Sequence, residues 1–192
     1  MEYLHWAEQI IPANASAEQI ADMYAKGFVF TRIGKGVMQQ TRSSRVDLSK
    51  FEMSSENRRI MKKTTDLTMN GRELLNPATA QAGTTPTDYD FTIGKMAKDF
   101  YDTKFSPGIM SAQKIKEMLT DKTKSNFNCL LSYSIPTAEK PIGHVICYTS
   151  DLIHHYSYPF YDLTLAPKDM GMGMMLRALE LCKKLGHKYM YL

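Results

Sequence analysis

The stretch that decides the fold is YPFYDLTLAPKDMGMGMMLRALELCKKLGHKYMYL, residues 158–192. It opens with strand formers over 158–165, turns at a glycine-containing segment, and continues as a helix that Gly186 ends. One face of that helix is apolar and is formed by Met175, Ala178, Leu179, Cys182 and Leu185. A final strand is expected over 187–192. Strand, helix and strand in this order predict a right-handed βαβ crossover between parallel strands.

The turn before the helix predicts an anion site. Gly171 and Gly173 place bare backbone at the helix N-terminus, where unpaired N–H groups and the helix dipole favour a phosphate or pyrophosphate. Lys168 adds one cation. The turn is not a Walker loop, because no Gly-Lys-Ser/Thr ends it, and Leu176 stands where a dinucleotide fingerprint has its third glycine. A structural helix cap is the alternative explanation for the two glycines.

The segment before this unit predicts two helices and then an antiparallel strand pair, at 91–104, 112–120, 126–134 and 140–149. Before them, residues 76–87 (NPATAQAGTTPT) predict a linker or long surface loop. We therefore expect a smaller α+β region over 1–87 and a main domain over 88–192. In the smaller region the sequence predicts a helix, a hairpin and a basic helix, over 17–26, 28–48 and 56–63.

The motif Lys168-x-x-Gly171-x-Gly173 after YDLTLAP, with the helix, Gly186 and HKYMYL behind it, resembles the acyl-CoA pyrophosphate loop of GNAT-fold acyltransferases. The resemblance spans about residues 91–192 and implies an α/β (α+β) fold, a GNAT-like mixed sheet with flanking helices. It implies acetyl-CoA or another acyl-CoA as donor. The implied donor-binding residues are Thr164, Leu165, Lys168, Asp169, Met170, Gly171, Met172, Gly173 and Met174. The family usually has Gln or Arg where this chain has Lys168, which keeps charge but cannot make a bidentate fork.

A second resemblance covers nearly the whole chain and is to arginyl-tRNA-protein transferases. The matching residues are Gly27-Phe28, Arg45-Val46, Phe51, Ser54, Arg58-Arg59 and the strand Tyr189-Met190-Tyr191-Leu192. That family's cysteine cluster is absent, with residues 38–42 (MQQTR) in its place. Gly173, in contrast, restores the acyl-CoA type of loop that the tRNA-dependent enzymes tend to lack. This resemblance implies aminoacyl-tRNA as the alternative donor.

The positive charge of the chain is concentrated between residues 42 and 63. Seven Lys or Arg residues stand there against three acids, an excess equal to the +4 of the whole chain. Such a patch could hold a tRNA acceptor stem or the phosphates of CoA, and its candidate residues are Arg42, Arg45, Arg58 and Arg59. The alternative is a solvated helix face with structural ion pairs.

Amide formation needs a neutral amine, a route for its proton, and donors for the developing oxyanion. We expect a free backbone N–H near Leu165 as the oxyanion donor. Asp162, His154 and His155 are the candidates for a base or water relay, and Tyr191 for a wall of the acyl site. Structural alternatives remain open: the aspartate could cap a turn, the histidines could occupy a loop, and the tyrosine could simply pack.

The composition of the chain excludes several classes of protein. Its 192 residues suffice for one sizeable domain, and a net charge of +4 is far below that of a dedicated nucleic-acid-binding arm. No apolar run approaches about 18 residues, and the N-terminus lacks the pattern of a signal peptide, so we expect a cytoplasmic protein that does not enter a membrane. The three cysteines, Cys129, Cys147 and Cys182, have no metal-ligand spacing, and we expect no metal site.

Three functions remain open from the sequence. The first is acyl transfer from acyl-CoA to an amine on a small molecule or a peptide N-terminus, and the second is aminoacyl transfer from tRNA. The third is a non-catalytic GNAT-fold binding module, because both families continue through further strands where this sequence stops at Leu192. If the last strand is a sheet edge, its unpaired backbone should bind a second strand, which predicts a dimer or a partner strand at the C-terminal edge.

Overall fold

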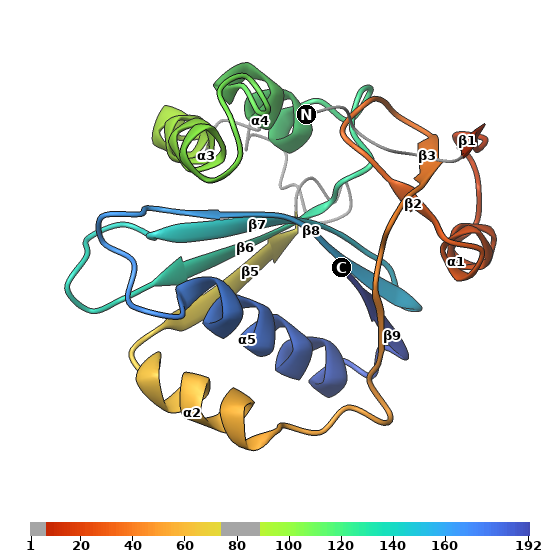
Figure 1. The fold of residues 1–192 in the computed structure, drawn as a ribbon. Helices are drawn as coiled ribbons and strands as arrows, with labels where there is room; N and C mark the ends of the chain where they lie inside the picture. The colour runs from red at the N-terminus through yellow and green to blue at the C-terminus, as the bar shows by residue number, and fades with distance from the viewer. Residues whose placement is uncertain (1–6, 74–88) are drawn as a thin grey trace, which may run out of the picture.

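The computed structural model describes residues 7–73 and 89–192 (Figure 1). Most of the strands form one six-stranded mixed sheet in the order β4-β9-β8-β7-β6-β5. In that order the strands are Arg45–Asp47, Tyr189–Tyr191, Ile153–Tyr161, Gly143–Thr149, Cys129–Ser134 and Thr68–Glu73. Neighbours are antiparallel except β8 and β9, which are parallel as the βαβ pattern predicts.

Helices cover both faces of this sheet (Figure 1). On one face lie α2 (Ser55–Lys63) and α5 (Met170–Lys184), and on the other lie α3 (Phe91–Lys104) and α4 (Ala112–Thr120). The second face also carries α1 (Ala17–Ala25) and a small antiparallel sheet in the order β1-β3-β2. The strands of the small sheet are Ala7–Ile10, Val37–Gln40 and Phe28–Phe30. This arrangement confirms the predicted fold class, a GNAT-like mixed sheet with flanking helices.

The two faces of the sheet have separate apolar cores because side chains alternate along each strand. Leu130 and Ile146 belong to the core shared with α3, α4 and the small sheet. Their chain neighbours Leu131 and Val145 belong to the core shared with α2 and α5. Each of these four side chains is almost fully buried. Alternate side chains of each strand therefore hold the sheet between its two helical layers.

Most helix boundaries agree with the prediction because capping side chains set them. The Ser16 and Gln19 side chains form a capping box at the start of α1, and Ser54 and Ser111 accept backbone N–H bonds at the starts of α2 and α4. Asp90 does the same for α3. No helix in the described part of the chain is long and apolar enough to cross a membrane.

Two expectations about strands need correction, and the predicted linker cannot be compared with the described structure. The strand predicted over 158–165 is β8, which runs from Ile153 to Tyr161 and ends where the Asp162 side chain accepts backbone bonds from the next turn. The second arm of the hairpin predicted over 28–48 is instead divided into β3 and β4, which belong to different sheets. The predicted linker at 76–87 lies outside the described residues. The main sheet takes β4 and β5 from before that segment and its other strands from after it.

The last strand is not a sheet edge, contrary to expectation. β9 pairs with β8 on one side and with β4 on the other, where Arg45 lies opposite Tyr191 and Asp47 opposite Tyr189. The edge of the sheet is therefore β4, a three-residue strand. The reason given for a partner strand at the C-terminal edge is wrong, because a strand more than 140 positions earlier in the sequence already occupies that place.

Candidate functional site

The candidate site begins at an irregularity in β8. Tyr158 pairs with Ile146 of β7 and Tyr156 with Cys147, so Ser157 has no partner in the register and forms a β-bulge. A bulge bends its strand away from regular pairing. On the other side of β8, pairing with β9 ends at the His155–Tyr191 pair. Among the described residues, no strand pairs with this side of β8 from 156 to 161, and we call this stretch the free edge of β8.

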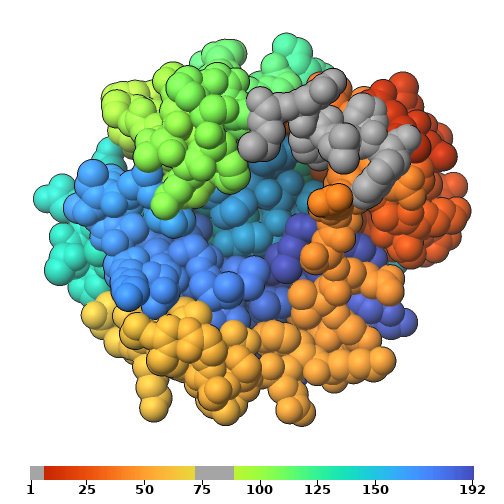
Figure 2. Space-filling model, in the orientation of Figure 1, coloured from red at the N-terminus to blue at the C-terminus, as the bar shows by residue number. Residues whose placement is uncertain are grey.

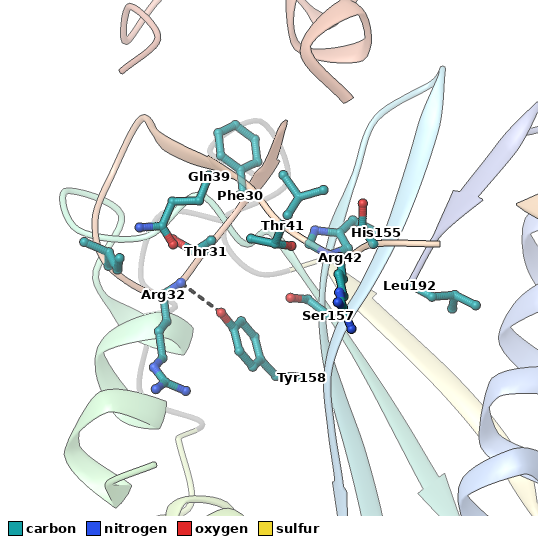
Figure 3. Close-up of a pocket in the computed structure, with 13 residues that line it drawn as sticks. Phe30, Thr31, Arg32, Gln39, Thr41, Arg42, His155, Ser157, Tyr158 and Leu192 are labelled. Carbon is teal, nitrogen blue, oxygen red and sulfur yellow. Dashed lines mark hydrogen bonds between the residues drawn. The ribbon is translucent and has the colours of Figure 1, made fainter. Parts of the chain in front are cut away.

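A cavity of about 330 Å³ lies at the start of the free edge (Figure 3). His155, Ser157 and Tyr158 form its wall on β8, while residues 29–33 and 41–43 form the opposite wall. The backbone N–H of Arg32 donates to the Tyr158 hydroxyl at 2.9 Å and joins the two walls. Figure 2 shows this face of the molecule hollowed above β8, between the green α3 and the orange segment that leads into β4.

The N-terminus of α5 lies at the other end of the free edge. A Cβ atom on Gly171 would lie 3.4 Å from Cε1 of Tyr161, the last residue of β8. From Ser157 to Tyr161 the strand spans about 13 Å, at roughly 3.3 Å per residue. An extended ligand along the free edge could therefore contact the cavity with one end and the start of α5 with the other.

The start of α5 has no side-chain cap, unlike those of α1 to α4. Asp169 adopts the left-handed conformation (φ 68°) there, and its side chain makes no cap hydrogen bond. The backbone N–H groups of Gly171 and Met172 lie in the first turn, where an α-helix supplies no acceptor of its own. Gly171 is partly exposed and Met172 exposed, so both residues reach the surface. This end of α5 therefore retains the anion-binding capacity that the turn predicts.

Gly173 serves the packing of two helices, which corrects its predicted place in the anion cradle. Its N–H donates to the Asp169 carbonyl at 2.9 Å, and a Cβ on it would lie 2.8 Å from the Thr64 hydroxyl oxygen at the end of α2. Met170 and Met174 are buried in the core below. Of the predicted donor residues in 168–174, those that reach the surface at this helix end are Lys168, Asp169, Gly171 and Met172.

Basic side chains of α2 surround the same helix end. The Asp169 carboxylate lies 3.5 Å from the Lys63 ammonium and 3.8 Å from the Arg59 guanidinium, which also pairs with Glu56. Lys168 is exposed beside them. The cations outnumber the acids here, so the surroundings of the α5 N-terminus favour an anion.

The predicted oxyanion donor is not free. The Leu165 N–H donates to Asp162 Oδ1 at 3.2 Å, and the same oxygen accepts from the N–H and hydroxyl of Thr164 at 2.8 and 2.6 Å. These hydrogen bonds, the Thr164 hydroxyl first, lower the pKa of Asp162, which favours its ionised form. The structure thus gives Asp162 the turn-capping contacts that the sequence left as an alternative.

Of the predicted catalytic side chains, His155 is the one that lines the cavity. Its Nδ1 bonds to the Tyr24 hydroxyl at 2.9 Å, and burial lowers its pKa to about 3, so the ring is neutral at pH 7. His154 faces the opposite side of the strand, beside the His187 ring at 6.1 Å, and burial lowers its pKa to about 4. Tyr191 is buried with its ring against that of Tyr24.

The structure distributes the four predicted arginines over three places. Arg42 lines the cavity, and Arg45 on β4 lies over the Tyr189 ring at 4.3 Å. Arg58 and Arg59 lie on α2, where the first donates to the Met53 carbonyl. The described part of the chain contains no group of three or more His, Cys, Asp or Glu residues placed to hold a metal ion.

Arg32, Ser157 and Tyr158 line the cavity but were not among the predicted site residues. No sequence signal distinguishes Arg32 from the other arginines. The bulge at Ser157 changes the alternation of side chains along β8, so a strand pattern with a constant period of two misassigns the faces here. A tyrosine in a strand is equally compatible with simple packing.

The class of fold follows from these observations and from comparison with solved structures. The sequence matches no protein-family model, and a search of curated proteins finds no match. The mixed sheet, the βαβ unit and the two helices before the strand pair define a GNAT-like α+β fold.

Solved structures with a similar fold have little sequence identity to this chain. The structure of L-PGS from Bacillus licheniformis matches with a TM-score of 0.50 and 12% identity, over 92% of this chain and 51% of that one. The C-terminal domain of a putative lysylphosphatidylglycerol synthetase from Agrobacterium fabrum matches with a TM-score of 0.52 and 12% identity, over the same shares, 92% and 51%. The chain thus spans about half the length of these solved structures, and the likeness shows the fold.

Proposed function

We propose that the protein transfers an acyl group to an amine, with the acyl donor lying along the free edge of β8. The observation that carries the proposal is the place where pairing with β9 ends. The bulge and the cavity lie at one end of the free edge of β8, and the uncapped start of α5 lies at its other end. One solved structure of similar fold is the C-terminal domain of a putative lysylphosphatidylglycerol synthetase. That name agrees with acyl transfer as the class of reaction.

The preferred donor is acetyl-CoA or another acyl-CoA. Its pyrophosphate would accept hydrogen bonds from the N–H groups of Gly171 and Met172, and Lys168 would add a charge. The free edge of β8 offers backbone groups to the extended arm between the pyrophosphate and the thioester. Pro159 is the exception, because it has no N–H and its carbonyl accepts from the Tyr101 hydroxyl at 3.2 Å. The thioester carbonyl would then lie near Ser157, at the bulge where β8 departs from regular pairing.

The chemistry requires the amine to be neutral when it attacks. The amine nitrogen forms a bond to the thioester carbon, the C–S bond breaks, and the thiolate leaves and takes up the proton that the amine loses. Arg32 and Arg42 at the cavity lower the pKa of a nearby ammonium, because like charges disfavour its charged form. This environment supplies the neutral amine without requiring a strong base, which fits the neutral, weakly basic His155.

The test is a calorimetric titration with acetyl-CoA. We expect binding at a dissociation constant of about 1 mM or tighter. Gly171→Asp should abolish it, because the new carboxylate repels the pyrophosphate. Gly171→Ala is the matched control and should bind like the wild type, since a Cβ there meets Tyr161 only at ordinary contact distance. Absence of binding by the folded wild type at about 1 mM acetyl-CoA would remove acyl-CoA as the donor.

Aminoacyl-tRNA is the second candidate donor, and the position of Arg59 and Lys63 beside the α5 N-terminus favours it specifically. Salt-sensitive binding of charged tRNA, weakened by Arg58→Gln and Arg59→Gln, is its expected signature. Retained binding after both substitutions would contradict this placement. If neither acyl-CoA nor charged tRNA binds, a non-catalytic binding module is the remaining proposal.

A further inference from the structure

We propose that the cavity at Ser157 binds a small carboxylate with an apolar body, and that a hydrophobic amino acid is the acceptor whose amine is acylated. The role of this ligand as the acceptor rests on the proposed function, whereas the binding site itself rests on the geometry of the cavity. Nothing in the comparisons assigns a ligand to it.

The charge of the cavity argues for an anion. Arg32 and Arg42 are the only charged side chains that line it, and neither guanidinium has a hydrogen bond or ion pair within the part of the chain that the structure describes. The other arginines with described side chains have partners. Arg59, for example, donates to Glu56, and Arg177 donates to Thr64. A guanidinium at a cavity is best satisfied by a carboxylate, which it can bind through two parallel hydrogen bonds.

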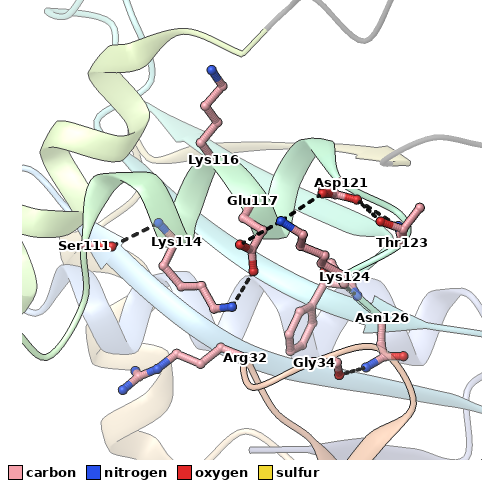
Figure 4. Close-up of polar contacts among 12 residues, drawn as sticks. Arg32, Gly34, Ser111, Lys114, Lys116, Glu117, Asp121, Thr123, Lys124 and Asn126 are labelled. Carbon is pink, nitrogen blue, oxygen red and sulfur yellow. Dashed lines mark hydrogen bonds and ion pairs between the residues drawn. The ribbon is translucent and has the colours of Figure 1, made fainter.

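Acids near Arg32 do not neutralise it, because they are already paired (Figure 4). Glu117 on α4 accepts a hydrogen bond from Lys114 and lies 3.8 Å from Lys124, while Asp121 lies 3.7 Å from the same Lys124. Figure 4 shows the Arg32 side chain pointing away from Glu117. The positive charge of Arg32 is therefore available to a ligand.

Two buried oxygen atoms of residues that line the cavity have no hydrogen-bond partner in the described structure. Thr31 Oγ1 and Gln39 Oε1 make no hydrogen bond in the described structure, although both residues line the cavity and are at least 95% buried. The bond from Gln39 Nε2 to Glu8 at 2.8 Å sets which end of the amide is the oxygen. An unpaired buried acceptor makes a hydrogen bond to a donor inside the cavity favourable.

The volume of the cavity and its apolar lining indicate the size of the ligand and the character of its side chain. A cavity of about 330 Å³ is at the small end of the range for ligand sites, which fits a single amino acid and not a folded protein segment. Val29, Phe30, Ile33 and Leu192 supply apolar walls. The carboxylate is expected at Arg42 and the amine toward Ser157, which lie close together in Figure 3, with an apolar side chain against these walls.

The experiment measures binding without any acyl donor, so that its failure is separate from failure of the proposed function. L-leucine and L-phenylalanine are titrated by ligand-observed NMR against L-leucinamide and L-phenylalaninamide, which keep the amine and the side chain but lack the carboxylate. We expect the amides to bind at least about 10-fold more weakly, because a charge-assisted hydrogen bond accounts for a factor of that size. Equal affinity for the acids and their amides, or no binding of either at about 10 mM, would overturn the inference.

Variants show whether the ligand occupies this cavity. Arg42→Gln should weaken L-leucine binding about 10-fold, and Arg42→Lys less, because the charge remains while the fork is lost. Lys50→Gln is the matched control: it removes the same charge from an exposed side chain eight positions away and should change nothing. Thr31→Val keeps the shape, removes a hydroxyl that has no partner, and should leave the fold at least as stable while weakening binding. Unchanged affinity in Arg42→Gln would place the ligand elsewhere and reject the proposal.

The two hypotheses can fail separately. Acetyl-CoA binding without amino acid binding would leave acyl transfer in place and reject this acceptor. Amino acid binding without acetyl-CoA or charged tRNA binding would retain the carboxylate site and reject the transferase. The titration with L-leucine is therefore repeated with and without 1 mM acetyl-CoA.

Discussion

Gly173 of α5 touches Thr64 at the end of α2 so closely that a Cβ atom on the glycine would lie 2.8 Å from the threonine hydroxyl oxygen. The two helices share one layer of the molecule (Figure 1). Their approach at this point depends on the absence of a side chain, as glycines often permit in packed helices. The same residue is the second glycine of the motif that predicts a pyrophosphate loop. In the structure, its lack of a side chain serves the contact between α5 and α2.

The two glycines of the turn should respond oppositely to alanine. Gly173→Ala should lower the free energy of unfolding by about 1–3 kcal/mol, because the methyl group overpacks the contact with Thr64. Gly171→Ala should be neutral or stabilising by up to about 1 kcal/mol, because alanine favours the helix and has room. Urea unfolding measures both. Equal effects of the two substitutions would contradict this division of roles.

Arg177 should be an important structural residue of the α2–α5 layer. Its guanidinium donates to the Leu67 carbonyl at 2.7 Å, to Thr64 Oγ1 at 2.9 Å and to the Gly173 carbonyl at 3.1 Å. Arg177→Met removes these hydrogen bonds, leaves the Leu67 carbonyl without its guanidinium donor, and should lower the free energy of unfolding by about 2 kcal/mol. Lys184→Met, on an exposed side chain at the end of the same helix, is the control and should change it by less than about 0.5 kcal/mol. A loss of similar size in both variants would show that charge, and not the bonds of Arg177, matters.

Acid should destabilise the protein through its buried histidines. Burial lowers the pKa of His154 to about 4 and that of His155 to about 3, whereas an unfolded histidine titrates near 6.5. Between these values the unfolded chain binds more protons, so the free energy of unfolding falls as pH decreases from about 6.5, by about 1.4 kcal/mol per pH unit for each histidine. His154→Leu should remove one histidine's share of that slope. Chemical unfolding at pH 7, 6 and 5 tests this, and an unchanged slope in the variant would contradict it.

Asp162 should act on the turn after β8 and not as the base of the reaction. Its carboxylate accepts bonds from Thr164 and Leu165, and Asp162→Ala should lower the free energy of unfolding by about 1–2 kcal/mol, as loss of a cap does. Because its pKa is lowered in the fold, the stability due to its charge is present above about pH 4 and is lost as pH falls further. Asp162→Asn keeps an acceptor oxygen and should retain most of any acyl transfer. A loss of activity of about 100-fold or more in a folded Asp162→Asn would show that the carboxylate is the base.

Local features of the sequence predicted the helices well. The helix predicted over 91–104 is α3 without change, and Ser54 and Ser111 cap α2 and α4 next to the ranges that the sequence predicts. Such agreement arises because a capping side chain and its N–H partner lie within three residues of each other. The parallel pair around α5 was also predictable, because a βαβ unit is continuous in the chain.

The candidate site was predictable only in part. The uncapped start of α5 follows from Gly171 and its neighbours, but the burial of His154 and the capping contacts of Asp162 do not. A histidine in a strand can face either side, and a bulge such as that at Ser157 changes which side it is.

By itself, the sequence determined where helices begin and end, which of their faces are apolar, and that a glycine turn opens the last helix, since all of these depend on residues a few positions apart. Only the tertiary structure decided that Arg32 and Arg42 meet His155 and Ser157 around one cavity, and that β4 lies along β9. Those contacts join residues more than 100 positions apart. Their free energy comes from burial and pairing that exist only after the chain has closed, which no local pattern encodes.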